Sequence, residues 1–491
     1  MKFLRTSEQE EAILKEDAWR WISTNESKII EASDKIWNFA ELGLVEYKSS
    51  ELLAKILEEN GFGVQRGVAD MPTAFVASWG SGKPVIGFQG EYDALPGVSQ
   101  KVSTKREPLI EGAPGHGCGH NIHGASAVAG AIATKVAMEN NGIAGTVRFY
   151  GTPAEETYSG KMFMVRDGFY DDADAVLSHH PGSSNVAGIG STLAVNSVKF
   201  HFHGVSSHAA YTPFLGKSAL DAVELMNTGV NFMREHIIQE ARIHYVIEDG
   251  GMQPNVVPPY ARSWYYIRAP ERVQVNHMYE WVQKIADGAD LMARTTHRVE
   301  FVEGIYNVLP NIGLSEVVTS NMREIGTPEY SKKELKFAEE LSATVSREDK
   351  LEELRLSRRP GWENLLDTSI DTEILDPWDE DIVWPGSTDV GDVSWVVPTM
   401  EFTTSTSVLG VGGHSWQVVA CCGHGIGHRS LIFAAKAMAG SAIDLFTKPD
   451  VLKKIHDEFE RRKAGRTYVS PVPKDIKPPV AMARKQAGFT D

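Results

Sequence analysis

The sequence has few cysteines, no excess of positive charge and no long apolar run, and each absence excludes a class of protein. The three cysteines, Cys118, Cys421 and Cys422, are too few for a disulfide framework, which favours a reducing, cytoplasmic location. The formal net charge of −16 argues against a nucleic-acid-binding surface. No segment reaches the roughly 18 apolar residues of a membrane span, and Met1–Glu10 has no apolar region typical of a secretion signal. We therefore expect an intracellular protein without nucleic-acid or membrane partners.

The segment richest in reactive side chains is Pro114–Gly124, which contains one cysteine and three histidines. Cys118 and His120 are two residues apart, so in an extended loop both side chains can face one metal ion. The Ala-rich run at 125–138 has the pattern of a buried helix, and we expect the loop to end at its N-terminus, where anionic ligands are stabilised. Taken alone, the motif also fits a glycine-rich turn whose histidines only form hydrogen bonds.

Strand-like and helix-like segments alternate along most of the chain. Residues 8–60 have the pattern of amphipathic helices, and a helical stretch is expected at 160–167. Strands are predicted at 74–79, 84–88, 146–150 and 175–178. This alternation predicts an α/β fold with a mainly parallel sheet flanked by helices.

From about residue 191 the pattern changes to β-α-β-β-α-β, the ferredoxin-like motif. Its predicted elements are a strand at 193–203, a helix at 218–236, strands at 243–247 and 262–268, a helix at 273–292 and a strand at 297–302. We therefore predict a metal-binding catalytic domain at 1–190 and 306–491, interrupted by an inserted ferredoxin-like α+β lid and dimerisation domain at 191–305. The edge of the small sheet can pair with a second copy, so a homodimer is expected.

Residues 310–380 are rich in charge and form an excursion or lid in this interpretation. The pattern predicts a helix over 332–358 and an irregular loop over 360–384. Trp362, Trp378 and Trp384 in this region fit either stacking on an aromatic acyl group or simple packing of the loop. The α/β pattern returns between 389 and 445, and the last dozen residues are expected to be loosely ordered.

Three further clusters follow predicted strands, where open α/β sheets bind ligands. In Glu155–Glu156 one carboxylate can hold a metal while the other acts as general base, although an isolated Glu-Glu pair is usually solvated. His179–His180 ends a strand, and His414 lies in a glycine-rich loop. The candidate ligands are Cys118, His120, Glu156, His180 and His414. Five ligands are too many for one tetrahedral site and predict two neighbouring divalent metal ions.

Together these motifs resemble the dinuclear metallopeptidases that include aminoacylases, glutamate carboxypeptidases and auxin-conjugate hydrolases. The resemblance covers about residues 30 to 480 and is carried by Glu91–Pro96 (EYDALP), Gly117–His120, Pro153–Glu156, His180 and His414. Segments 115–121, 387–395 and 413–416 look most similar to the aminobenzoyl-glutamate hydrolases. Two positions depart from the family. Asn121 stands where many auxin-conjugate hydrolases have Asp, and Glu91 stands where the wider family has a histidine ligand.

The resemblance implies a role for each site residue. The five candidate ligands would hold the two metals, Glu155 would be general base and proton shuttle, and Asp93 would orient a histidine ligand. Zinc suits the thiolate, whereas manganese or cobalt would also suit the other ligands. His116, His123, His179, His424 and His428 are expected to be structural or to support ligands.

Three residues of the insertion would complete the site by the same resemblance. His208 would reach across a dimer to stabilise the oxyanion, and Asn255 and Arg268 would bind the substrate's carbonyl and free carboxylate. Without the family, these residues fit a turn cap, an Asx turn and a surface ion pair equally well.

The leading functional hypothesis is metal-dependent hydrolysis of the amide bond in N-acyl or N-aroyl amino acids, such as aminobenzoyl-glutamate or indoleacetyl-aspartate conjugates. Water would be activated at the metals with Glu155 as base. Two alternatives stay open: a metal-binding component of a hetero-oligomeric hydrolase that needs a related partner subunit, and a broad dipeptidase.

Overall fold

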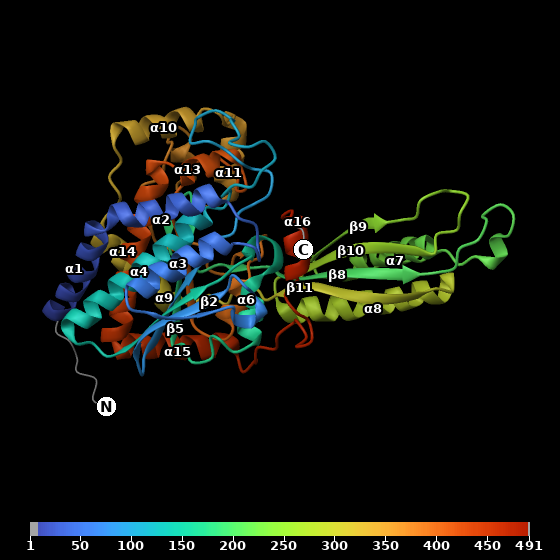
Figure 1. Cartoon of the computed structure of the whole chain (residues 1–491), viewed down its shortest axis with the longest axis horizontal. Coiled ribbons are helices and arrows are strands. Elements are labelled where there is room, and N and C mark those ends of the chain that lie inside the picture. Colours follow the sequence, from blue (N-terminus) through green and yellow to red (C-terminus); the bar gives the residue numbers. More distant parts are fainter. Residues whose placement is uncertain (1–7, 490–491) are drawn as a thin grey trace.

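The computed structural model describes residues 8–489, and its larger sheet organises the body of the molecule (Figure 1). The strands of this sheet are β1 (Gly63–Arg66), β2 (Phe75–Ser81), β3 (Val85–Gly90), β4 (Gly145–Gly151), β5 (Ala175–Gly182), β6 (Asn185–Val186), β12 (Ile374–Leu375) and β14 (Thr399–Ser405). Their spatial order is β1-β2-β4-β3-β5-β14-β6-β12. The central strands β4, β3, β5 and β14 pair in parallel, whereas β1–β2, β2–β4 and β14–β6 are antiparallel. The predicted α/β fold is confirmed, with its antiparallel pairs on either side of a parallel centre.

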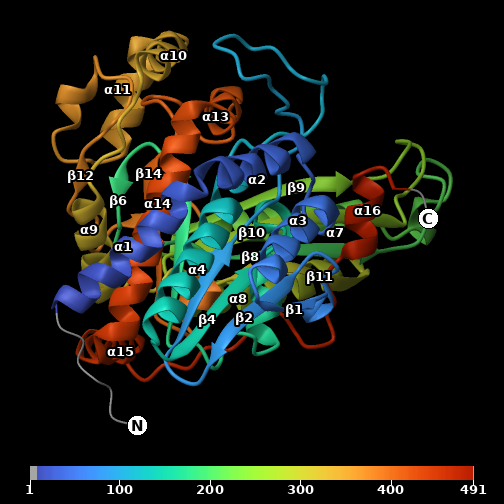
Figure 2. The ribbon, with the colours of Figure 1, turned by 60° about the vertical axis from the view of Figure 1, so that its left-hand side comes forward.

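Helices cover both faces of this sheet (Figure 2). They are α1 (Glu8–Thr24), α2 (Glu26–Phe39), α3 (Tyr47–Glu59), α4 (His120–Asn141), α5 (Glu155–Tyr158), α6 (Gly160–Arg166), α9 (Ile312–Ile325), α10 (Lys332–Ser342), α11 (Arg347–Leu356), α12 (Val390–Ser394), α13 (Trp416–Cys422), α14 (Gly425–Thr447), α15 (Pro449–Lys463) and α16 (Val480–Gln486). Residues 1–7, most of the segment tested for a secretion signal, lie outside the described residues.

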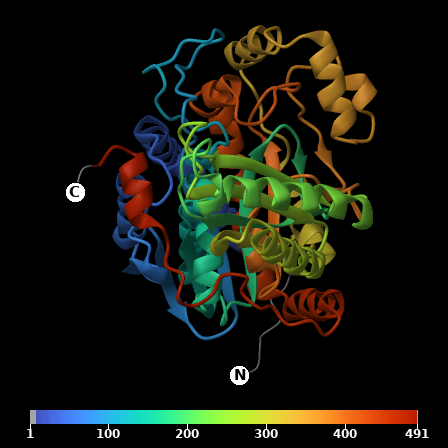
Figure 3. The ribbon, with the colours of Figure 1, turned by 90° about the vertical axis from the view of Figure 1, so that its right-hand side faces the viewer.

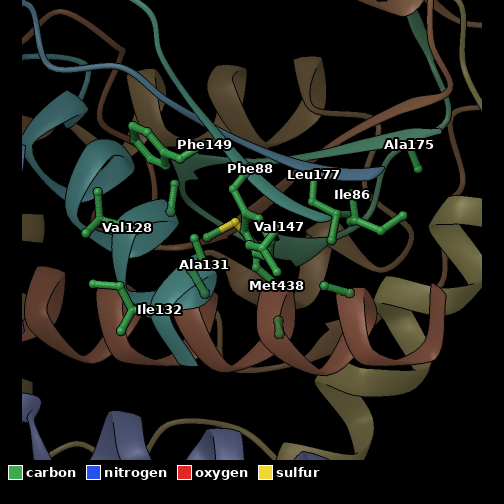
Figure 4. Close-up of a cluster of buried hydrophobic side chains, with 14 of the residues drawn as sticks. Ile86, Phe88, Val128, Ala131, Ile132, Val147, Phe149, Ala175, Leu177 and Met438 are labelled. Carbon is green, nitrogen blue, oxygen red and sulfur yellow. The ribbon is translucent and has the colours of Figure 1, made fainter. Parts of the chain in front are cut away.

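The main core lies between the sheet and the helices α4 and α14, as Figure 4 shows. Phe88 of β3 and Leu177 of β5 point toward Ala131 of α4 and Met438 of α14, and all four side chains are almost fully buried. Burying each large apolar side chain contributes about 1.5–3 kcal/mol. This core fixes the start of α4, and therefore His120, against the ends of the parallel strands.

Helix α14 corrects one sequence-based expectation. Gly425–Thr447 is long and apolar enough to cross a membrane by composition, but 89% of its most apolar window is buried inside the protein. Its small, uncharged side chains pack against α4 and the sheet, so its apolar character serves the core.

The chain end is more ordered than expected. The last dozen residues were expected to be loose, yet Val480–Gln486 forms α16, and Ala483 is buried beside the core of the second sheet face. Tyr158 also donates a hydrogen bond to Gln486. These contacts order the segment even though four prolines precede it.

The excursion also differs in detail. The expected helix over 332–358 is divided into α10 and α11, because Ser346 begins a new helix by accepting a hydrogen bond from the Asp349 amide at 3.0 Å. The loop that follows contains a short 3₁₀ turn, Trp362–Leu365, and the strand β13 (Val383–Trp384), which pairs with β7 (Ser191–Thr192).

The second sheet projects from the body as a separate layer (Figures 1 and 3). It consists of β8 (Ala194–His203), β9 (Arg242–Asp249), β10 (Tyr260–Ala269) and β11 (Thr296–Ile305), with α7 (Ala219–Met233) and α8 (Arg272–Ala293) packed on it. Its antiparallel order, β11-β8-β10-β9, is that of the ferredoxin-like motif. The chain enters and leaves this layer at the ends of β8 and β11 nearest the body, and the loops 204–218 and 250–259 form the far tip.

Candidate active site

The structure brings all five predicted ligands together at the carboxyl edge of the parallel strands. One group, Cys118, His120 and His180, and a second, Cys118, Glu156 and His414, each have their ligand atoms within 4.8 Å of one another. They come from the loop before α4, the start of α4, the start of α5, β5 and the loop after β14. Because Cys118 belongs to both groups, its thiolate can bridge two adjacent cations.

Gly119 allows the backbone to turn between the two ligands of the first motif. It has a φ of +78°, and a Cβ at this position would lie 2.8 Å from Pro181. His120 is therefore the first residue of α4, as the sequence predicted. Only glycine combines this conformation with such close packing.

Hydrogen bonds orient two of the histidines for metal binding. His120 Nδ1 donates to Asp93 Oδ1 at 2.9 Å, and His180 Nδ1 donates to the carbonyl of Pro181 at 2.9 Å. In each neutral ring the Nε2 lone pair is then free. His180 Nε2 lies 3.4 Å from Cys118 Sγ, a separation that two ligands of one ion can have.

The site also contains acceptors that have no donor. Glu91 Oε2, His120 Nε2 and Glu156 Oε1 are buried and have no hydrogen-bond partner within residues 8–489. Glu91 Oε2 lies only 3.1 Å from His120 Nε2. Two facing acceptors at this distance require a cation or a proton between them, so the residues present fit a divalent-metal site.

His123 belongs to a further cluster, with Glu91 and Glu401, but its tautomer is the wrong one for a ligand. The Glu91 amide donates to His123 Nδ1 at 3.0 Å, so Nε2 carries the proton of the neutral ring. That N–H faces Ser178 Oγ at 3.2 Å and Glu401 Oε1 at 3.9 Å. The cluster is a hydrogen-bonding network that supports Glu91.

The other histidines expected to be structural are bonded within the fold. His116, His179, His424 and His428 contact, respectively, the Ile36 carbonyl, the hydroxyls of Ser126 and Thr404, the Ile426 amide and the Asp34 carboxylate.

Asp93 connects the two metal-binding segments. Its Oδ1 accepts from His120 and its Oδ2 accepts from the Glu156 amide at 3.0 Å. One carboxylate therefore fixes a ligand ring and the backbone of a second ligand.

Glu155 lies beside this cluster, within 4.8 Å of ligand atoms of Glu91 and His120. Burial raises the pKa of Glu155 well above its usual value, and the charges of Glu91 and Asp389 raise it further. A carboxylate with such a high proton affinity is suited to accept and return a proton.

Sequence reasoning missed the charged groups beneath the site. Lys161 is fully buried, and its Nζ lies 2.6 Å from both Glu91 Oε1 and Asp389 Oδ1. Glu46 is also buried and accepts from the Ala154 amide at 2.8 Å, which holds the turn before Glu155. A lysine in the otherwise apolar segment 160–165 was the one local signal for this network.

The lid residues do not converge on the ligands within one chain. His208 and Asn255 lie together at the far tip, where the Ala209 amide donates to the Asn255 carbonyl at 3.0 Å. Arg268 lies near the other end of β10, roughly 25 Å from its first residue at about 3.3 Å per residue. Arg268 is thus close to the body, whereas the other two are remote from it.

Comparisons with known proteins agree with this arrangement. The description Peptidase family M20/M25/M40 matches residues 87–415. The chain is 41% identical to one of the two kinds of subunit named for the p-aminobenzoyl-glutamate hydrolase of Escherichia coli, over 93% of this chain and 97% of that protein. It is 28% identical to the Xaa-Arg dipeptidase of Mus musculus, over 93% and 94% of the two chains.

Solved structures show the same fold. An aminohydrolase of methicillin-resistant Staphylococcus aureus aligns with a TM-score of 0.62 and 18% identity, covering 88% of this chain and 99% of that one. A dinuclear metal-binding peptidase of Bacillus subtilis aligns with a TM-score of 0.54 and 15% identity, covering 87% and 99%. The chain belongs to the peptidase family M20/M25/M40.

Proposed function

We propose that this protein hydrolyses the amide bond of N-acyl or N-aroyl amino acids with two divalent metal ions. The observation that carries the proposal is the pair of ligand groups that share Cys118 beside Glu155. A relative with 41% identity is named for aminobenzoyl-glutamate, which belongs to this class of amide.

The ligand residues would be Cys118, His120, Glu156, His180 and His414, and the ions zinc, manganese or cobalt. Bound metal would polarise the scissile carbonyl and acidify water. Burial raises the pKa of the Cys118 thiol to about 12, so metal binding would release its proton. Glu155 accepts the proton of the attacking water and delivers it to the departing amine.

The lid residues complete the site in two ways. Arg268 binds the free carboxylate of the substrate, because its planar guanidinium matches a carboxylate. His208 and Asn255 act from a second copy of the chain, since their own tip is remote from the ligands. The proposal therefore includes a homodimer paired through the lid, where β9 is an open edge strand. Three free thiols support a cytoplasmic location.

The decisive variant is Glu155→Gln in the metal-loaded protein. We expect turnover of N-benzoylglutamate to fall by at least about 10³-fold, because the proton shuttle is lost, while metal content stays at wild-type level. Glu139→Gln, on the exposed end of α4, is the matched control and should be fully active. Retained activity in Glu155→Gln would refute the mechanism.

A dipeptidase is the second candidate, favoured by the Xaa-Arg dipeptidase relative. A panel of N-acyl amino acids against dipeptides separates the two, because a dipeptidase requires the free amine. The chain is also 27% identical to the other kind of subunit named for the Escherichia coli hydrolase, over 45% of this chain and 53% of that protein. Assaying the purified single chain with added manganese or zinc tests whether a second type of chain is needed.

A further inference from the structure

A cavity of about 370 Å³ begins next to the catalytic cluster and extends under the hinge between the two sheets. Its walls are β14, α12, the hinge segments 186–192 and 308–310, and the loop that carries Trp378 and Trp384. Glu401 lies at its inner end, where Glu401 Oε1 accepts from Ser178 Oγ at 3.2 Å and lies 3.9 Å from His123 Nε2. The cavity therefore adjoins the Glu91–His123 network of the site.

Two indole rings form the outer wall. Trp384 is held rigidly, because its Nε1 donates to Asp379 Oδ2 at 3.0 Å and Asp379 Oδ1 accepts from the Ile189 amide at 2.8 Å. A Cβ at Gly190 would lie 2.6 Å from the same carboxylate, so the glycine permits this contact. Trp378 Nε1 is buried and has no hydrogen-bond partner within residues 8–489. The wall thus offers flat apolar faces and one unused donor.

The charge of the cavity decides which end of a substrate it accepts. Asp379 and Glu401 line it, and no lysine, arginine or histidine of the described residues does. Burial alone would raise the pKa of Glu401, but the hydrogen bond from His123 and the charge of His180 outweigh it and lower this pKa. The amino-acid end of an acyl amino acid carries a carboxylate and is repelled here. The acyl end carries none.

We propose that this cavity is the acyl-group subsite and that it selects flat aromatic acyl groups without negative charge. The proposal rests on the amide-hydrolase function above and deepens it by naming the substrate class. The volume lies within the usual range of ligand pockets, about 300–1,000 Å³. The excursion that the sequence left without a role provides the aromatic wall.

The test compares N-benzoylglutamate with N-acetylglutamate on Trp378→Ala, Trp384→Ala and the control Trp362→Ala. Trp362 lies in the same excursion but outside the cavity. We expect kcat/KM for the benzoyl substrate to fall about tenfold or more in the first two variants, with a change under about threefold for the acetyl substrate. Trp362→Ala should match wild type, and wild type should discriminate against N-(4-carboxybenzoyl)glutamate. Equal losses on both substrates, or no loss on either, would overturn the subsite.

Equilibrium binding separates this proposal from the function itself. Isothermal titration of N-benzoylglutamate into metal-loaded Glu155→Gln, with and without Trp378→Ala, measures occupancy without turnover. Binding that Trp378→Ala weakens supports the subsite even if wild type hydrolyses nothing, a result that would refute only the function. Binding that Trp378→Ala leaves unchanged overturns the subsite even if wild type is an active hydrolase.

Discussion

Lys161 Nζ lies 2.6 Å from Glu91 Oε1, and both side chains are buried. The same ammonium contacts Asp389 Oδ1 at 2.6 Å, and the Lys161 amide donates to Asp389 Oδ2 at 2.9 Å. One cation thus balances two buried carboxylates directly beneath the proposed metal centre. Glu91, which stands where the wider family has a histidine ligand, is held by this contact with its other oxygen toward His120.

Lys161→Met should destabilise the fold by about 3–5 kcal/mol, because it leaves two buried carboxylates without a counter-charge. Adding Asp389→Asn should recover part of that loss by removing one of the two charges. Denaturant titration of both variants measures the effect, with Lys135→Met, an exposed ion pair on α4, as control. If Lys161→Met costs no more than Lys135→Met, the ion cluster does not stabilise the fold.

Asp93→Asn should weaken metal binding about 10- to 100-fold, because the amide cannot accept from His120 and Glu156 as strongly as the carboxylate. Chelator competition against the metal-loaded protein measures this directly. Asp457→Asn, in an exposed pair on α15, is the control. Unchanged affinity would show that the hydrogen bonds of Asp93 do not support the ligands.

His414→Ala should reduce bound metal from two ions to one, since His414 belongs to only one of the two ligand groups. His236→Ala removes another exposed histidine, outside the site, and should keep both ions. Elemental analysis after dialysis counts the ions, and the metal-dependent rise in Tm should shrink accordingly. Two ions retained by His414→Ala would exclude His414 as a ligand.

Stability should fall as the pH rises from about 4 to 7 through Asp392. Burial raises the pKa of Asp392 to about 7, although hydrogen bonds from Tyr468 and the Tyr306 amide oppose the rise. In this window the unfolded chain has released the Asp392 proton and the native protein has kept it, so increasing pH favours unfolding. Asp392→Asn should flatten that part of the profile in urea titrations at pH 5 and 8. A parallel profile in the variant would contradict the assignment.

The ligand set could be predicted because its signals are local. Cys118 and His120 are two residues apart, and Glu156 and His180 follow predicted strands, whose carboxyl ends meet at one edge of a parallel sheet. The structure gathers these residues where the pattern predicts. Their metal-binding roles stay predictions that the experiments above address.

His123 and Lys161 show what local patterns cannot decide. His123 lies in the same motif as His120, yet a backbone amide from the end of β3 assigns it the opposite tautomer. Lys161 resembles a solvated lysine in sequence, and its burial depends on Glu91 and Asp389, which are remote along the chain.

The amino-acid sequence by itself determined the α/β architecture, the lid insertion and the cluster of metal-binding side chains, because periodicity and spacing along the chain encode them. Tertiary structure alone decided which ring nitrogens are free, where the buried cation lies, that His208 is remote from Glu155 in its own chain, and that Trp378 and Trp384 line a cavity beside the site. Those features depend on contacts between segments tens to hundreds of residues apart, and such contacts form only when the chain packs.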